Sequence, residues 1–133
     1  SEGMSGGASG TDSDDNLYGG AGNDILYASA GDNTLDGGTG ADTIYSGTGS
    51  DVIVIRSGDG GSSISDADTL ADFSDGVDLI GLSSLQYSDL TVEQGTGSYS
   101  SHVVVKKTDT GEFLIIIQNT SLSSISDADF SAI

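Results

Sequence analysis

A nine-residue period runs through the first part of the chain and limits the folds that it can adopt. Starting at Gly10, five consecutive units read GTDSDDNLY, GGAGNDILY, ASAGDNTLD, GGTGADTIY and SGTGSDVIV. The second and fourth units match the pattern G-G-x-G-x-D-x-U-x, where U is a large aliphatic residue, at every specified position. Such a short repeat predicts a solenoid, in which each unit contacts only its neighbours and stability comes from stacking.

Two positions of the unit carry its chemistry. The sixth is acidic in four units and Asn in the third: Asp15, Asp24, Asn33, Asp42 and Asp51. The eighth is always a large aliphatic residue: Leu17, Leu26, Leu35, Ile44 and Ile53. The first six residues of a unit predict a glycine-dependent turn with inward backbone carbonyls, and the last three predict a short strand whose aliphatic residue faces inward.

This pattern resembles the calcium-binding RTX repeat of proteins exported by Gram-negative type I secretion. The resemblance implies a parallel β-roll with two units in each turn, so that units two apart stack on the same edge. Asp24 and Asp42 then share one edge, and Asp15, Asn33 and Asp51 share the other. Tyr27 and Tyr45 face outward on one sheet, where we expect cross-turn packing rather than a contact surface.

The same resemblance implies that each Ca²⁺ lies between stacked turns and takes the position-six side chain of both. Backbone carbonyls complete the set, because Ca²⁺ prefers six to eight oxygen ligands, and we expect about three to five ions. Sites that share Asn33 should bind more weakly, since the amide lacks a charge. The turn residues expected to supply further oxygen ligands to the ions are Gly10, Asp12, Gly19, Ala21, Gly31, Gly37, Gly38, Thr39, Gly40, Gly47 and Gly49.

The charge of the chain fits a cation-dependent fold. Acidic residues outnumber basic ones 21 to 3, for a net charge of −18. Without counter-ions such repulsion and low hydrophobicity predict a disordered chain, and bound cations remove that repulsion. The three cations Arg56, Lys106 and Lys107 are too few for a nucleic-acid partner. The absence of Cys excludes disulfides and zinc–thiolate sites.

The second half of the chain predicts a cap for the open end of the roll. Strands are expected at 68–73, 78–82 and 89–93, followed by a hairpin of 102–107 and 112–118. A solenoid needs such a cap, because its last turn exposes unpaired edges and core. The expected fold is therefore all-β: a leader at 1–9, a parallel β-roll at 10–60, and an antiparallel β cap at 61–133.

The segment DADTLADFSDGVDLIGL, which starts at Asp66, again resembles the family. RTX rolls often end in a D-x-I-x-D-F-like segment, so the resemblance implies that Asp72 closes the last calcium site and Asp68 supports it. Asp59 is a weaker candidate, because it lies near the next expected sixth position. Asp75 and Asp78 are better explained by turn chemistry.

The heptapeptide SSISDAD occurs at 62–68 and again at 123–129. Different residues follow the two copies, so we expect different roles. Ser124 and Asp127 form an S-x-x-D pattern that predicts one helical turn in the second copy. In proteins that the chain resembles, an uncleaved export signal of this composition lies at the C-terminus.

The sequence predicts a binding module rather than an enzyme. It has one His and no Cys, and its G-x-S-x-G match at 3–7 lies in a Gly/Ser-rich leader without the strand and helix that a nucleophile elbow needs. The resemblance implies a secreted or surface-attached monomer of a Gram-negative bacterium, most like the end of a large RTX adhesin. Its partners would be the type I secretion apparatus and upstream domains, without membrane insertion. Two alternatives remain: the tail of a secreted lipase or protease, and a calcium-dependent adhesion domain that binds a ligand itself.

Overall fold

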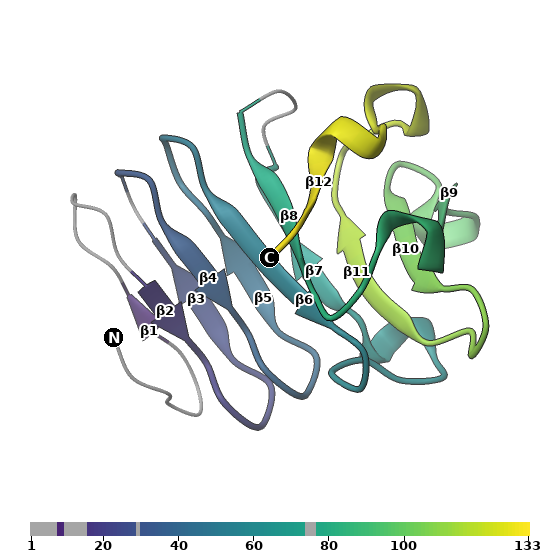
Figure 1. Cartoon of the computed structure of the whole chain (residues 1–133), viewed down its shortest axis with the longest axis horizontal. Coiled ribbons are helices and arrows are strands. Elements are labelled where there is room, and N and C mark those ends of the chain that lie inside the picture. The colour runs from purple at the N-terminus through teal and green to yellow at the C-terminus, as the bar shows by residue number, and fades with distance from the viewer. Residues whose placement is uncertain (1–7, 10–15, 29, 74–76) are drawn as a thin grey trace.

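The computed structural model describes residues 8–9, 16–28, 30–73 and 77–133, which form two facing β-sheets (Figure 1). One sheet has the order β1-β3-β5-β7-β11-β10-β9, and the other has the order β12-β8-β6-β4-β2. The strands of the first sheet are β1 (Ala8–Ser9), β3 (Ile25–Tyr27), β5 (Thr43–Tyr45), β7 (Asp68–Leu70), β9 (Leu90–Gln94), β10 (Val103–Lys107) and β11 (Phe113–Ile117). Those of the second are β2 (Asn16–Tyr18), β4 (Thr34–Asp36), β6 (Val52–Arg56), β8 (Leu79–Ser83) and β12 (Phe130–Ala132).

Successive strands of the repeat alternate between the two sheets. Parallel pairing aligns Leu26 with Ile44 in one sheet and Leu35 with Ile53 in the other. Each pair is two nine-residue units apart, so two units form one turn of the roll, as the resemblance implied. The strands consequently lie side by side along one axis, with their turns along two edges (Figure 1).

The eighth positions form the core of the roll. Leu17 is 3% exposed, and its four counterparts in the later units are completely buried. The neighbours of the middle residue stay at least partly exposed on the four three-residue strands β2 to β5, whereas β6 also buries Val54 and Ile55. Tyr27 and Tyr45 stack on the outer face with ring centroids 4.7 Å apart and planes 2° apart, which confirms the expected cross-turn packing.

The turns stack so closely that some positions admit only glycine. Gly38 has a φ of +81°, and a Cβ there would lie 2.2 Å from the carbonyl oxygen of Gly20 in the preceding turn. Both the left-handed backbone and the close approach therefore exclude a side chain.

The parallel pairing continues beyond residue 60. β7 pairs with β5 and β8 pairs with β6, so each adds one more strand to its sheet. β9, β10 and β11 form the antiparallel part of the cap. However, β11 also pairs parallel with β7, and β12 pairs parallel with β8. The cap is thus antiparallel only in part, and it extends both sheets of the roll.

The C-terminal segment differs from the expected helical turn. It forms two short 3-10 turns, η4 (Leu122–Ser124) and η5 (Asp127–Asp129), and then strand β12. The predicted Ser124–Asp127 cap is wrong, because Oδ2 of Asp129 instead accepts the N–H of Ser126 at 2.9 Å. None of the helical turns among the described residues is long and apolar enough to cross a membrane.

The two SSISDAD copies adopt different local structures. In the first, Asp66 accepts the N–H of Ser63 at 3.1 Å within η1 (Ile64–Asp66), and Asp68 begins β7. In the second, the capping carboxylate is the last Asp of the heptapeptide, Asp129. The copies therefore differ in structure, as expected, because the residues after each copy decide where its turn begins.

Candidate metal-binding turns

The sixth positions form two columns, one at each edge of the roll. On the first edge, the N–H of Asp24 donates to Oδ1 of Asp42 at 2.7 Å, and the N–H of Asp42 donates to Oδ1 of Asp68 at 2.9 Å. On the second edge, the N–H of Asn33 donates to Oδ1 of Asp51 at 2.8 Å, and Asp51 makes the same 2.9 Å contact with Asp78. Each column thus binds successive turns together through side-chain oxygens.

The second carboxylate oxygens of Asp42 and Asp51 have no hydrogen-bond partner among the residues that the structure describes. Both residues are 1% exposed, and Oδ2 of each is buried. A buried carboxylate oxygen without a donor is costly, because it has lost its water and gained nothing in return. A cation at each position would remove this cost.

On the first edge, glycine lets the backbone approach the carboxylates of the column closely. A Cβ at Gly37 would lie 2.3 Å from Oδ2 of Asp42, inside the same turn. A Cβ at Gly19 would lie 2.7 Å from Oδ2 of Asp24 and 2.7 Å from the Gly37 carbonyl oxygen. Carboxylate and carbonyl oxygens therefore face the same small space, and this donor set fits Ca²⁺, a hard cation.

Backbone carbonyls must supply most of the ligands. Nowhere in the described part of the chain do three or more Asp, Glu, His or Cys side chains converge on a point that could hold a metal. Each expected site would instead take one position-six side chain from each of two stacked turns. Such a site exists only when the turns are stacked, because the unfolded chain holds neither oxygen set in place.

Burial makes the columns expensive to ionise without a counter-charge. Loss of solvation raises the pKa of Asp51 to about 6. Burial likewise raises the pKa values of Asp42 and Asp68, and the neighbouring carboxylates raise them further. The columns therefore favour a bound positive charge, either a proton or a metal ion.

The Asn33 side chain donates hydrogen bonds to carbonyl oxygens of its own turn, which an Asp carboxylate could not do. Its Nδ2 donates to the carbonyl oxygens of Gly31 at 3.1 Å, Ala30 at 3.3 Å and Ala28 at 3.5 Å. The amide therefore faces the carbonyls that a cation would contact in a complete unit. Weaker calcium binding at sites that share Asn33 stays a prediction, and the contacts give it a second cause besides the missing charge.

Asp68 and Asp72 lie at the end of the roll, but they do different things. Asp68 is the third member of the first column. Asp72 accepts the N–H of Ser46 with Oδ1 and the N–H of Gly47 with Oδ2, both at 2.8 Å. Asp72 thereby tethers the turn that contains Asp51, and whether it also binds an ion stays a prediction.

Asp78 was missed as a column residue. Turn chemistry was the preferred explanation for it, but Asp78 is 1% exposed and accepts the N–H of Asp51. One signal could have identified it: Asp78 directly precedes strand β8, as Asp24 precedes β3. Asp75 lies outside the described residues.

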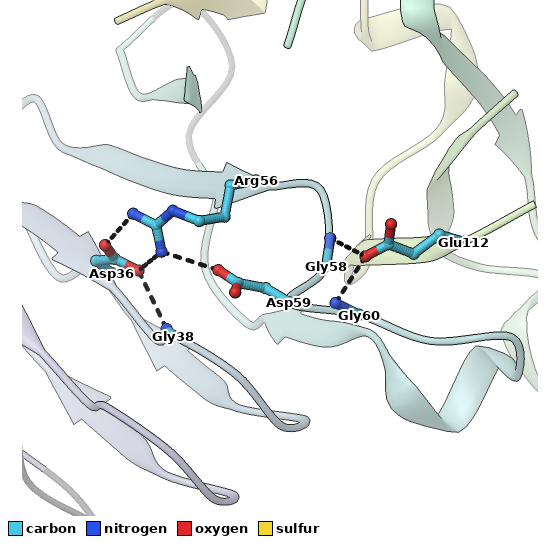
Figure 2. A network of polar contacts seen from close by, with 7 residues as sticks. All are labelled: Asp36, Gly38, Arg56, Gly58, Asp59, Gly60 and Glu112. Atoms are coloured by element: carbon cyan, nitrogen blue, oxygen red, sulfur yellow. Dashed lines mark hydrogen bonds and ion pairs between the residues drawn. The ribbon is translucent and has the colours of Figure 1, made fainter. Parts of the chain in front are cut away.

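The other expected ligands fall into three groups. Gly10, Asp12 and Asp15 lie outside the described residues. Asp59 lies outside the columns, where its Oδ2 accepts from Arg56 at 2.9 Å (Figure 2). The remaining residues occupy turns of the first edge (Gly19, Ala21, Gly37, Gly38, Thr39 and Gly40) or of the second edge (Gly31, Gly47 and Gly49).

Comparisons with known proteins agree with this geometry. The family model of the RTX calcium-binding nonapeptide repeat matches residues 9–44, 18–53 and 27–62. The AlgE6R3 subunit of the Azotobacter vinelandii mannuronan C5-epimerase superposes with a TM-score of 0.58 at 25% identity, over 92% of this chain and 80% of the subunit. The AlgE6R2 subunit of that epimerase superposes with a TM-score of 0.59 at 25% identity, over 98% and 93% respectively. No curated protein matches the chain.

Proposed function

Residues 9–62 belong to the RTX calcium-binding nonapeptide-repeat family, and we propose that the chain is a non-catalytic folding switch driven by calcium. In this proposal the roll is disordered when Ca²⁺ is scarce and assembles when Ca²⁺ binds between its stacked turns. The product is a rigid module whose task is structural.

One observation carries the proposal: the buried Oδ2 atoms of Asp42 and Asp51, which accept no hydrogen bond from any described residue. Each lies in a column in which carboxylates follow one another from turn to turn. Without a cation the column combines desolvation with like-charge repulsion, and both favour the unfolded chain. A bound cation reverses both effects, so its binding free energy becomes folding free energy.

The affinity expected of such sites suits export. Extracellular calcium modules bind with dissociation constants of about 10⁻⁴ to 10⁻³ M, above the Ca²⁺ level inside cells. An unfolded chain of net charge −18 can be threaded through a secretion channel and then fold outside. We therefore propose that the chain is secreted by the type I apparatus of a Gram-negative bacterium.

The position of the cap supports a role at the end of a larger protein. β11 and β12 continue both sheets of the roll, so the cap shields the last turn from further pairing. We propose that it ends a large surface adhesin, acts as a monomer, and carries the export signal near its C-terminus. A folded cap outside the cell would also prevent the chain from sliding back.

A second candidate has the same calcium chemistry in a different parent protein. The two similar structures are subunits of an epimerase, which favours a non-catalytic module attached to a secreted enzyme. The rest of the parent gene distinguishes the two: tandem β-sandwich repeats indicate an adhesin, whereas a catalytic domain indicates an enzyme.

Circular dichroism during a Ca²⁺ titration tests the switch. We expect a disordered spectrum in EDTA, a cooperative gain of β-structure as Ca²⁺ is added, and reversal by EDTA. Mg²⁺ at the same concentration serves as the control, because its smaller octahedral shell fits a carbonyl-lined turn poorly. A β-rich spectrum that EDTA leaves unchanged would refute the folding switch.

A further inference from the structure

Residues 55–60, called the sixth turn below, keep one feature of the repeat. Gly58 has a φ of +98°, close to +94° at Gly22 and +92° at Gly40, which hold the fourth position of their units. Gly58 lies 18 residues after Gly40, so it takes the same place by sequence count. It does not stack as they do, because a Cβ at Gly40 would lie 2.4 Å from the Gly22 carbonyl oxygen, whereas no described atom would lie within 4 Å of one at Gly58.

The chemistry of this sixth turn is different. Gly60 lies 18 residues after Asp42, but the column continues at Asp68 instead, so this turn holds no position-six oxygen ligand. Arg56 stands at the second position, which is Gly in the second, fourth and fifth units. The turn has thus lost a carboxylate and gained a cation.

Arg56 uses its guanidinium to join the roll to this turn (Figure 2). Nη1 and Nη2 donate to the two carboxylate oxygens of Asp36 at 3.0 Å and 2.5 Å. Nη1 also donates to Oδ2 of Asp59 at 2.9 Å. Asp36 belongs to β4 and Arg56 ends β6, so one side chain binds two neighbouring strands and the turn after them.

Glu112 holds the same turn from the side of the cap. Its Oε2 accepts the N–H of Gly58 at 2.7 Å and the N–H of Gly60 at 2.9 Å (Figure 2). The backbone continues this contact, because Gly61 and Phe113 form an antiparallel bridge. A Cβ at Gly60 would lie 1.8 Å from the Phe113 carbonyl oxygen, so the two segments are in close contact. Asp36, Arg56, Asp59 and Glu112 are called the junction residues below.

We propose that the junction residues form a calcium-independent clasp, in which the Arg56 guanidinium supplies the positive charge that Ca²⁺ supplies in the earlier turns. The clasp keeps the sixth turn docked on the cap when Ca²⁺ is removed. The inference rests on the proposed folding switch and refines it. Calcium loss unfolds the turns that precede Asp36, while the contacts among the junction residues and with the cap persist.

The physical basis is the permanence of the charge. Arginine stays protonated at every pH that proteins meet, and its planar fork matches a carboxylate at two points. Bonding to Asp36 raises the pKa of Arg56 further. Charge-assisted bidentate contacts are about twice as strong as neutral ones, and this one is reinforced by the Glu112 contacts of the same turn. None of these contacts needs a metal ion.

Amide hydrogen exchange of the full chain, with and without EDTA, tests the clasp. The junction is read at the N–H groups of Gly58, Gly60 and Phe113, and the roll at those of Asp24 and Asn33. In EDTA we expect the roll amides to exchange at unfolded rates and the junction amides to exchange at least about tenfold more slowly. In Ca²⁺ both sets should be protected.

Arg56→Met removes the charge and keeps the apolar stem. We expect it to lose junction protection in EDTA and to keep roll protection in Ca²⁺. Arg56→Lys keeps the charge but loses the two-point contact with Asp36. Glu112→Gln weakens the contacts with the N–H groups of Gly58 and Gly60. Both variants should retain part of the junction protection. Lys107→Met is the matched control, since Lys107 pairs with the exposed Asp109 in the hairpin turn.

Two results would overturn the clasp: wild-type junction amides that exchange as fast as roll amides in EDTA, or an Arg56→Met variant with unchanged junction protection. A different result would refute the folding switch, namely roll amides that stay protected in EDTA. In that case the effect of Arg56→Met on the junction amides, relative to the roll amides, still decides for or against the clasp.

Discussion

The backbone N–H of Asp24 donates a 2.7 Å hydrogen bond to Oδ1 of Asp42, which lies 18 residues later. Asp42 therefore has two tasks on its two oxygens. Oδ1 holds the preceding turn, and the buried Oδ2 lies against Gly37 of its own turn, with no hydrogen-bond partner among the described residues. Substitutions can separate these tasks, because an amide keeps one oxygen and loses the charge.

Asp42→Asn should weaken calcium-driven folding while leaving the stacking contact possible. Asn retains an oxygen for the N–H of Asp24, but it cannot supply a negative charge to either neighbouring site. Calcium affinity follows the charge of the ligand set, so we expect the Ca²⁺ concentration at half-folding to rise about tenfold. Asp109→Asn makes the same change in the hairpin, where the side chain is 71% exposed, and should leave the titration unchanged. Equal midpoints for both variants would disprove the assignment of Asp42.

Asn33→Asp should convert the third unit into a stronger calcium site. The Asn33 amide donates to the carbonyls of Ala28, Ala30 and Gly31, and a carboxylate cannot. The variant should therefore depend more strongly on Ca²⁺ for folding, and it should bind Ca²⁺ more tightly or take up one further ion in calorimetry. Asn23→Asp adds the same charge at an exposed position whose Oδ1 accepts the N–H of Ala41. The assignment fails if the two variants behave alike.

Periodicity made the roll predictable. A residue at the sixth position recurs in the same place on each turn, so the stacking of Asp24 on Asp42 follows from the repeat length together with the two units per turn that the family resemblance implies. Burial of the eighth positions follows in the same way, because alternate residues of a strand face opposite sides. The strands of the cap could also be located, since their apolar runs are too long for a solvated surface.

The end of the roll could not be predicted from the repeat. Asp42 and its partner Asp68 are 26 residues apart, and Asp51 and its partner Asp78 are 27 apart, instead of 18. Insertions of different length restore the same contact, and only the paired strands show which Asp takes the place. The clasp was equally hidden, because Glu112 is far from Gly58 and Gly60 in the sequence and reaches them only when β11 lies beside β7.

Gly38→Ala should destabilise the calcium-loaded protein more than Gly111→Ala. Both glycines have positive φ, +81° and +74°, so both variants bear a similar backbone cost. Only at Gly38 would the new Cβ meet backbone, 2.2 Å from the Gly20 carbonyl oxygen, whereas nothing lies within 4 Å at Gly111. We expect an additional loss of about 1–3 kcal/mol at Gly38, as for other overpacked sites. Thermal unfolding in saturating Ca²⁺ measures the difference, and equal losses would mean that the turns are not closely stacked.

Acid should partly replace calcium. Burial raises the pKa of Asp51 to about 6, above the value of about 3.9 for an unfolded Asp. Between these two pH values the calcium-free folded state binds more protons than the unfolded state. The stability that protonation of Asp51 contributes therefore falls as pH rises, and it is lost once the pH passes about 6. Asp42 and Asp68 shift in the same direction and should extend the effect to higher pH.

Circular dichroism in EDTA measures this effect, and we expect more β-structure at about pH 5 than at about pH 7.5. Protons and Ca²⁺ bind the same oxygens, and either one stabilises the folded state relative to the unfolded chain, so the Ca²⁺ concentration at half-folding should fall on acidification to about pH 5. Asp51→Asn removes one of these titrating groups and should flatten the pH dependence, while Asp109→Asn should not. A calcium-free chain that becomes less ordered on acidification would show that the columns do not bind protons on folding, and the raised pKa values would then be wrong.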